Sequence, residues 1–164
     1  MRWLWIDKFT QFTPGESATA VKNVSLAEEH LHDLYPAFPI MPHSLIIEGM
    51  AQTSGILVGA ARDFAEKVIL AKIGRATFHR LVRPGDTLAY HAKIDQLNET
   101  GASISGQVKA GLDARAPVVA DIQLMFSHID KNMAGLAFPE HNFVFTEQFI
   151  ELLKTYKMGA AITI

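Results

Sequence analysis

Two short segments at the start of the chain have the side chains of β-strands. Residues 3–12 and 17–24 are rich in β-branched and aromatic residues, which favour extended backbone. Thr13-Pro14-Gly15-Glu16 separates them and places proline before glycine, a pattern typical of a β-turn. We therefore expect a hairpin. The next segment, residues 25–43, contains Pro36, Pro39 and Pro42, which block a continuous helix, so we expect an irregular loop there.

A long apolar segment follows this loop and predicts a buried helix. Ser44 can cap the N-terminus of this helix by accepting a backbone N–H bond, and residues 45–64 contain no proline. Apolar side chains occur around most of the helix rather than along one stripe, which indicates that a sheet wraps it. These apolar residues are Leu45, Ile46, Ile47, Met50, Ala51, Ile56, Leu57 and Val58.

Four more segments with the composition of strands follow the helix. They are residues 67–76, 87–96, 102–110 and 117–127, and turn-like sequences separate them. A hairpin, one long helix and a run of antiparallel strands predict an α+β fold, in which a curved antiparallel sheet wraps one long central helix. We expect this domain to span residues 1–130.

Residues 131–164 are expected to form a C-terminal extension that contains a helix. Apolar side chains recur at helical spacing on one face of this segment. The opposite face carries mixed charge, so we expect the helix to cover a sheet edge or a partner subunit rather than to lie on a membrane. The predicted helix runs from Phe145 to Met158, with Phe149, Leu152, Leu153 and Tyr156 on its apolar face.

Composition narrows the range of possible functions. The chain has 164 residues and a formal net charge of −2, so no long-range positive field is available to attract nucleic acid. It has no cysteine, which excludes disulfides, thiolate metal sites and a cysteine nucleophile. The longest apolar stretch, residues 44–61, is shorter than the roughly 20 residues of a membrane span. Asp7 interrupts the N-terminus before a signal-peptide core could form, so we expect a cytoplasmic protein.

One motif resembles a known family of enzymes. Residues 39–52, Pro-Ile-Met-Pro-His-Ser-Leu-Ile-Ile-Glu-Gly-Met-Ala-Gln, are similar to the central-helix signature of the 3-hydroxyacyl-acyl-carrier-protein dehydratases. Residues 7–24 resemble the first hairpin of that family, and residues 83–88 resemble its turn and strand after the helix. The resemblance extends over residues 3–128 and implies a hot-dog fold.

The resemblance also implies which residues form the site. In this family a histidine in a His-Phe-Pro-Gly loop and an acid on the helix carry out a β-elimination, and each contributes about 10²–10⁴-fold to the rate. Glu48 matches the helix acid, and Gln52, one turn further on, matches a polar neighbour that could orient it. The loop is replaced here by Leu34-Tyr35-Pro36-Ala37. Leu34 therefore stands at the histidine position and Ala37 at the glycine position, both beside the substrate.

Two other histidines are candidates for the base that Leu34 cannot supply. His43 stands where the family has a glycine after Pro42, and its backbone N–H could also contact the thioester oxygen. His32 lies two residues before Leu34. A solvated or helix-capping role remains the alternative for both histidines. His30, His32 and Asp33 form no convincing metal site, because no further ligand has suitable spacing, and we expect neither a metal nor a cofactor.

Three functions remain open. The first is dehydration of 3-hydroxyacyl thioesters of acyl carrier protein or coenzyme A, in fatty-acid or polyketide-type metabolism, with Glu48 as the acid and His43 or His32 as the base. The second is a hot-dog thioesterase in which Glu48 activates water or attacks the thioester. The third is a non-catalytic acyl-binding subunit. Because the family site lies between two subunits, the resemblance implies a homodimer or an assembly of dimers.

Overall fold

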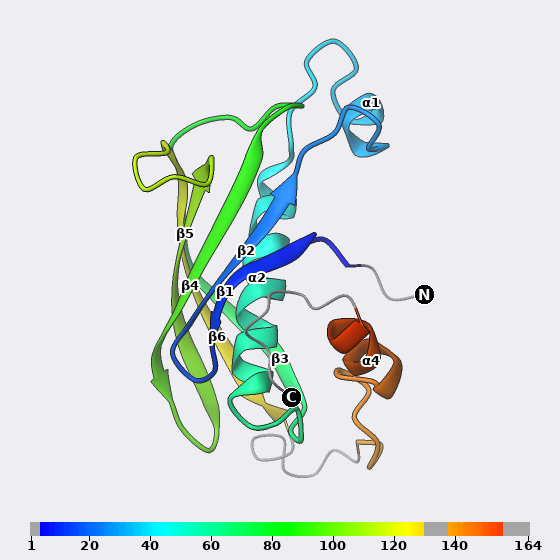
Figure 1. Ribbon diagram of the computed structural model, residues 1–164, viewed down its shortest axis with the longest axis vertical. Coiled ribbons are helices and arrows are strands. Elements are labelled where there is room, and N and C mark those ends of the chain that lie inside the picture. Colours follow the sequence, from blue (N-terminus) through cyan, green and yellow to red (C-terminus); the bar gives the residue numbers. More distant parts are fainter. Residues whose placement is uncertain (1–3, 130–137, 156–164) are drawn as a thin grey trace.

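The computed structural model describes residues 4–129 and 138–155. A six-stranded antiparallel sheet curves around one long helix, α2 (His43–Ala60) (Figure 1). The order of strands in the sheet is β1-β2-β4-β5-β6-β3, so β1 and β3 form its edges. This confirms the predicted hot-dog fold. The strands are β1 (Lys8–Thr13), β2 (Ser17–Asn23), β3 (Val68–Phe78), β4 (Thr87–Leu97), β5 (Gly101–Ala110) and β6 (Val118–His128).

The predicted hairpin forms β1 and β2. The Glu16 N–H donates to the Thr13 carbonyl at 3.0 Å, and Gly15 has a φ of +76°, a conformation that glycine adopts without a Cβ clash. The first strand begins at Lys8 rather than at residue 3. Residues 4–7 form no regular element, and the Trp5 backbone N–H donates a hydrogen bond to Gln52 of α2.

The start of α2 differs from the prediction. Pro42 occupies the N-cap position, and Ser44 lies inside the helix and makes no capping hydrogen bond. The Pro42 carbonyl accepts the N–H groups of Leu45 and Ile46 at 3.0 and 3.3 Å. The N-cap and the start of the helix therefore lie two residues earlier than a Ser44 cap would place them. It ends at Ala60, before Asp63 and Phe64 adopt positive φ angles of 51° and 55°.

A short helix, α1 (His30–Asp33), interrupts the segment for which we expected an irregular loop. That expectation was wrong at these positions because the helix ends before the first proline, Pro36, can disturb it. The Leu31 side chain is buried and attaches this turn of helix to the core. The segment that follows α1, including Leu34 and Ala37, is exposed and non-helical.

One face of α2 packs against the sheet. Ile46, Met50 and Leu57 are buried there, and the helix contacts β2, β3, β4, β5 and β6. Gly49 allows the closest approach, because a Cβ atom at this position would overlap the Tyr90 ring of β4. Glu48 and Gln52 lie on a different, half-buried face of the same helix.

The C-terminal part of the chain contributes helix α4 (Glu147–Thr155), which lies beside α2 (Figure 1). The Thr146 hydroxyl accepts the N–H of Phe149 at 3.3 Å and caps this helix. Phe149 and Leu153, two residues of the predicted apolar face, are buried in the core. Tyr156 and Met158 fall outside the described residues, as does the predicted domain boundary at residue 130. Within the described part of the chain, no helix has the length and apolar character needed to cross a membrane.

Candidate active site

A cavity of about 300 Å³ lies beside the half-buried face of α2. This volume is at the lower end of the roughly 300–1,000 Å³ that is typical of small-molecule sites. Most of its wall is apolar, and its two polar side chains are Glu48 and Gln52. The apolar part comes from α2 itself and from four regions that are distant from it in sequence: the N-terminal segment, β3, β6 and the segment that includes α4. Such a cavity suits an apolar ligand that carries one reactive polar group.

Gln52 connects the Glu48 carboxylate to the main chain. The Trp5 backbone N–H donates to Gln52 Oε1 at 2.7 Å, and Gln52 Nε2 donates to Glu48 Oε1 at 2.8 Å. A backbone N–H can only donate, so it fixes which end of the amide faces Trp5. The amide nitrogen must then face Glu48. The carboxylate is therefore held by a side chain whose own orientation is determined.

Trp5 is itself held on several sides. Its indole ring lies 4.4 Å from the Lys22 ammonium in a cation–π contact, and its centroid is 5.3 Å from the His30 ring. Burial raises the pKa of the Tyr90 hydroxyl well above its ordinary value, and the nearby Trp5 side chain offsets part of this rise. The donor that orients Gln52 therefore belongs to a packed segment.

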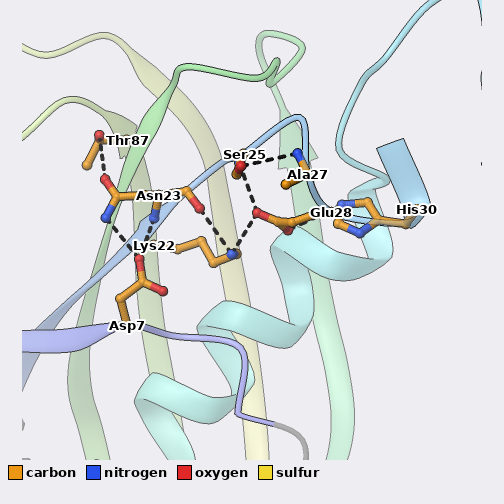
Figure 2. A network of polar contacts seen from close by, with 8 residues as sticks. All are labelled: Asp7, Lys22, Asn23, Ser25, Ala27, Glu28, His30 and Thr87. Carbon is orange, nitrogen blue, oxygen red and sulfur yellow. Dashed lines mark hydrogen bonds and ion pairs between the residues drawn. The ribbon is translucent and has the colours of Figure 1, made fainter. Parts of the chain in front are cut away.

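A polar network supports this segment next to α1 (Figure 2). Lys22 Nζ donates to the Asn23 carbonyl and to Glu28 Oε1, both at 3.0 Å. Asp7 Oδ2 accepts the backbone N–H of Asn23 at 2.6 Å. Glu28 Oε1 also accepts the Ser25 N–H at 2.9 Å. These bonds join the N-terminal segment to β2 and to the turn before α1.

The structure brings together only two of the predicted site residues. Glu48 and Gln52 share the cavity, but His43, His32, Leu34 and Ala37 do not line it. His43 is exposed, and its ring stacks on Phe78 with a centroid distance of 3.9 Å and an interplanar angle of 3°. His32 and Ala37 are exposed, and Leu34 is 55% exposed. Within one chain, Glu48 therefore has no histidine partner among the residues that the structure describes around the cavity.

Sequence reasoning missed the contributions of both ends of the chain. Leu4 joins the wall from the N-terminal side, and Val144, Phe145 and Phe149 join it from the C-terminal side. Trp5 acts through its backbone N–H, which has no signature in the sequence. One sequence signal was available for the C-terminal side. Thr146 lies four positions after Asn142 and directly before an apolar helix, which is typical of an N-cap residue.

Other titratable clusters lie apart from the cavity. On the exposed face of the sheet, Asp121 accepts from Gln107 Nε2 at 3.0 Å and pairs with His79 Nε2 at 2.8 Å. These two hydrogen bonds hold the pKa of Asp121 below its ordinary value. His128 is fully buried, with its Nδ1 2.8 Å from Glu66 Oε2. Within residues 4–129 and 138–155, no three histidine or carboxylate side chains converge as a metal site would require.

Comparison with known proteins identifies relatives over the region that contains Glu48. The model of the FabA-like domain matches residues 1–122. A 3-hydroxyacyl-[acyl-carrier-protein] dehydratase FabZ from Rickettsia bellii is 37% identical over 109 residues, which are 65% of this chain and 75% of the relative. A FabZ dehydratase from Lactobacillus helveticus is 34% identical over 124 residues, which are 75% of this chain and 81% of the relative.

Solved structures share the fold at low sequence identity. A Streptococcus mutans protein bound to acetyl CoA has a TM-score of 0.61 and 13% identity, and the match covers 77% of this chain and 91% of that one. The dehydratase heterocomplex ApeI:P from Xenorhabdus doucetiae has a TM-score of 0.59 and 15% identity, with 76% and 82% coverage. The family match takes in most of the sheet and all of α2, and the chain belongs to the FabA-like family, with FabZ dehydratases among its relatives.

Proposed function

We propose that this protein dehydrates 3-hydroxyacyl thioesters, with Glu48 as the acid. The observation that carries the proposal is the Glu48 carboxylate, which faces an apolar cavity and is held by Gln52 through a 2.8 Å hydrogen bond. An acyl chain can occupy the apolar wall while its 3-hydroxyl group meets the carboxyl group. Membership of a family that includes FabZ dehydratases supports the same chemistry.

The proposed reaction is a β-elimination. A base removes a proton from the carbon beside the thioester carbonyl, and the electron pair forms the new double bond. Protonated Glu48 gives its proton to the 3-hydroxyl group, which leaves as water. The first N–H groups of α2, at His43 and Ser44, have no acceptor within the helix. They can therefore donate to the negative oxygen of the intermediate and stabilise it.

We place the base on a second subunit. The loop after α1 is exposed and does not reach the cavity of its own chain. Strand β3 lies at an open sheet edge, and its Leu70 and Ile73 side chains are 39% and 44% exposed. A second copy that pairs along this edge could bring its own loop, with His32 beside Leu34, toward Glu48. His43, at the start of α2, is the other candidate base.

The proposed substrate carrier is acyl carrier protein, as in fatty-acid biosynthesis. The names of the FabZ relatives support this carrier. A thioester of coenzyme A presents the same acyl group and the same reactive carbons. The proposed site does not depend on which carrier delivers them.

A thioesterase is the second candidate, and one observation favours it. The cavity wall, as far as the structure describes it, holds one carboxylate and one amide but no histidine. Glu48 could activate water or attack the thioester carbonyl without a second protein base. This chemistry would release free thiol, whereas dehydration leaves the thioester intact.

The test follows the interconversion of 3-hydroxyacyl and enoyl thioesters by absorbance. Glu48→Gln keeps an oxygen that can accept from Gln52 but loses the transferable proton, so we expect a rate about 10²–10⁴-fold below wild type. Glu99→Gln, at an exposed turn between β4 and β5, should match wild type. Full activity of Glu48→Gln would contradict the proposal.

Three further variants locate the base in the same assay. Loss of activity in His32→Ala or His43→Ala would identify the histidine that removes the proton. If both variants keep the wild-type rate, neither proposed histidine is the base. Leu34→His tests the position that the family motif assigns to its own histidine, and we expect this substitution to raise the rate.

A further inference from the structure

The segment from Asn142 to Phe149 is fixed by hydrogen bonds to the connection between α2 and β3. Asn142 Nδ2 donates to the carbonyls of Phe64 and Glu66 at 3.0 and 3.2 Å. Asn142 Oδ1 accepts the N–H groups of Val144 and Phe145 at 3.0 and 2.9 Å. One side chain therefore both anchors the segment and shapes its turn.

Aromatic packing holds the same segment against the core. The Phe145 ring lies 5.1 Å from Phe64 in an edge-to-face contact and 6.2 Å from the Phe149 ring. Gly59 of α2 makes room for Phe145, because a Cβ atom there would overlap its ring. Phe145 and Phe149 are each 7% exposed. The two rings therefore occupy a defined position rather than a loose surface contact.

These rings form part of the wall of the Glu48 cavity. Val144, Phe145 and Phe149 line it together with Glu48 and Gln52. Helix α4 lies to one side of α2 (Figure 1), and its Phe149 shares the cavity with Glu48 and Gln52 of α2. The segment also lies beyond residues 1–122, the part of the chain that matches the FabA-like domain. The family match therefore does not account for this wall.

We propose that Phe149, supported by Phe145, limits the length of the acyl chain that enters the Glu48 cavity. This inference rests on the proposed function, because it assigns the cavity to an acyl group. The volume of about 300 Å³ suits a short chain, since small-molecule sites extend to roughly 1,000 Å³. A longer chain would need the space that the Phe149 ring now fills. The substrate class is short-chain 3-hydroxyacyl thioesters.

The test measures binding by calorimetry with unreactive amide analogues of 3-hydroxybutanoyl-, 3-hydroxyoctanoyl- and 3-hydroxydodecanoyl-pantetheine. Wild type should bind the butanoyl compound more tightly than the dodecanoyl compound. Phe149→Ala opens the wall, and each additional buried methylene strengthens binding roughly fourfold. We expect the octanoyl-to-butanoyl affinity ratio to rise at least about tenfold in this variant.

Two further variants keep the test decisive. Phe143→Ala makes the same substitution at an exposed position of the same segment, where the ring is 37% exposed and does not line the cavity, and it should keep the wild-type profile. Phe149→Leu preserves an apolar contact in case the alanine variant does not fold, and it should shift the profile in the same direction by less. Unchanged profiles in Phe149→Ala or Phe149→Leu would overturn the inference.

The same proteins separate this inference from the proposed reaction. If wild type binds the amides in the expected order but converts no thioester, the dehydratase proposal fails and the role of Phe149 stands. If wild type converts thioesters and the folded Phe149 variants keep its length preference, the role of Phe149 fails and the dehydratase proposal stands.

Discussion

Glu48 owes its orientation to a peptide N–H from another part of the chain. Gln52 accepts a hydrogen bond from the Trp5 backbone N–H and donates one to Glu48. Two successive hydrogen bonds therefore connect the carboxylate to the N-terminal segment and align it. The i, i+4 spacing of Glu48 and Gln52 places them on one side of a helix. The orientation of the Gln52 amide, by contrast, follows from a backbone donor and the packing of the Trp5 ring.

Two partly buried histidines make the stability of the fold depend on pH. Burial lowers the pKa of His91, and the nearby charge of Lys109 lowers it further. Burial also lowers the pKa of His30, against the attraction of Glu28. The unfolded chain therefore takes up protons first as the pH falls below about 6.5. We expect the free energy of unfolding to fall between about pH 7 and pH 5, measured by urea denaturation.

A variant of His91 tests this prediction. His91→Gln removes the titrating ring but keeps a polar group that can bond to Thr19, which lies 3.0 Å from His91 Nδ1. Its loss of stability in acid should be smaller than that of wild type. His32→Gln replaces an exposed ring and should follow wild type. Equal acid sensitivity of His91→Gln and wild type would argue against a contribution from the buried ring.

Sequence reasoning identified Glu48 and Gln52 because the motif and the helical spacing both involve side chains on one element. It did not place Trp5, Val144, Phe145 or Phe149 at the cavity. Their contributions depend on how the two ends of the chain pack against α2, which no local pattern encodes. For the same reason the sequence left open whether His43 and His32 line the site or lie exposed, and both lie exposed.

At the scale of elements, the contact of α2 with β4 depends on the absence of a side chain at Gly49. A Cβ atom there would overlap the buried Tyr90 ring. Gly49→Ala must shift the helix or the ring, and we expect it to lower the free energy of unfolding by about 1–3 kcal/mol in urea denaturation.

The same substitution elsewhere in α2 provides the control. A Cβ atom at Gly55 would meet only the edge of the Phe126 ring, at 3.4 Å. Alanine also favours helix over glycine by roughly 1 kcal/mol. Gly55→Ala should therefore be neutral or slightly stabilising. A Gly49→Ala protein as stable as wild type would show that the helix is not held close to Tyr90.

Elements with strong local signals were predicted well. The last four strands lie within two residues of their predicted bounds, because glycine and proline turns separate them. The start of α2 was misplaced because Pro42 already served as the N-cap. Helix α1 was missed because so short a helix depends on tertiary packing, here the burial of Leu31, rather than on its own sequence.

At the scale of the whole molecule, the open edge at β3 predicts a dimer. Its exposed Leu70 and Ile73 side chains would be covered by a second copy. Sedimentation at micromolar concentration should give the mass of a dimer, and Ile73→Glu should shift it toward monomer. Leu112→Glu, at a turn where leucine is 63% exposed, is the matched control. A wild-type monomer would contradict a site completed by two subunits.

The central claim is that the Glu48 cavity eliminates water from a 3-hydroxyacyl thioester. The most direct test incubates wild type with 3-hydroxybutanoyl-pantetheine and resolves all products by NMR. The account predicts a mixture of hydroxyacyl and enoyl thioesters with no free thiol, and enoyl product that forms about 10²–10⁴-fold more slowly with Glu48→Gln. Release of free thiol and a carboxylic acid, or binding without any product, would contradict it.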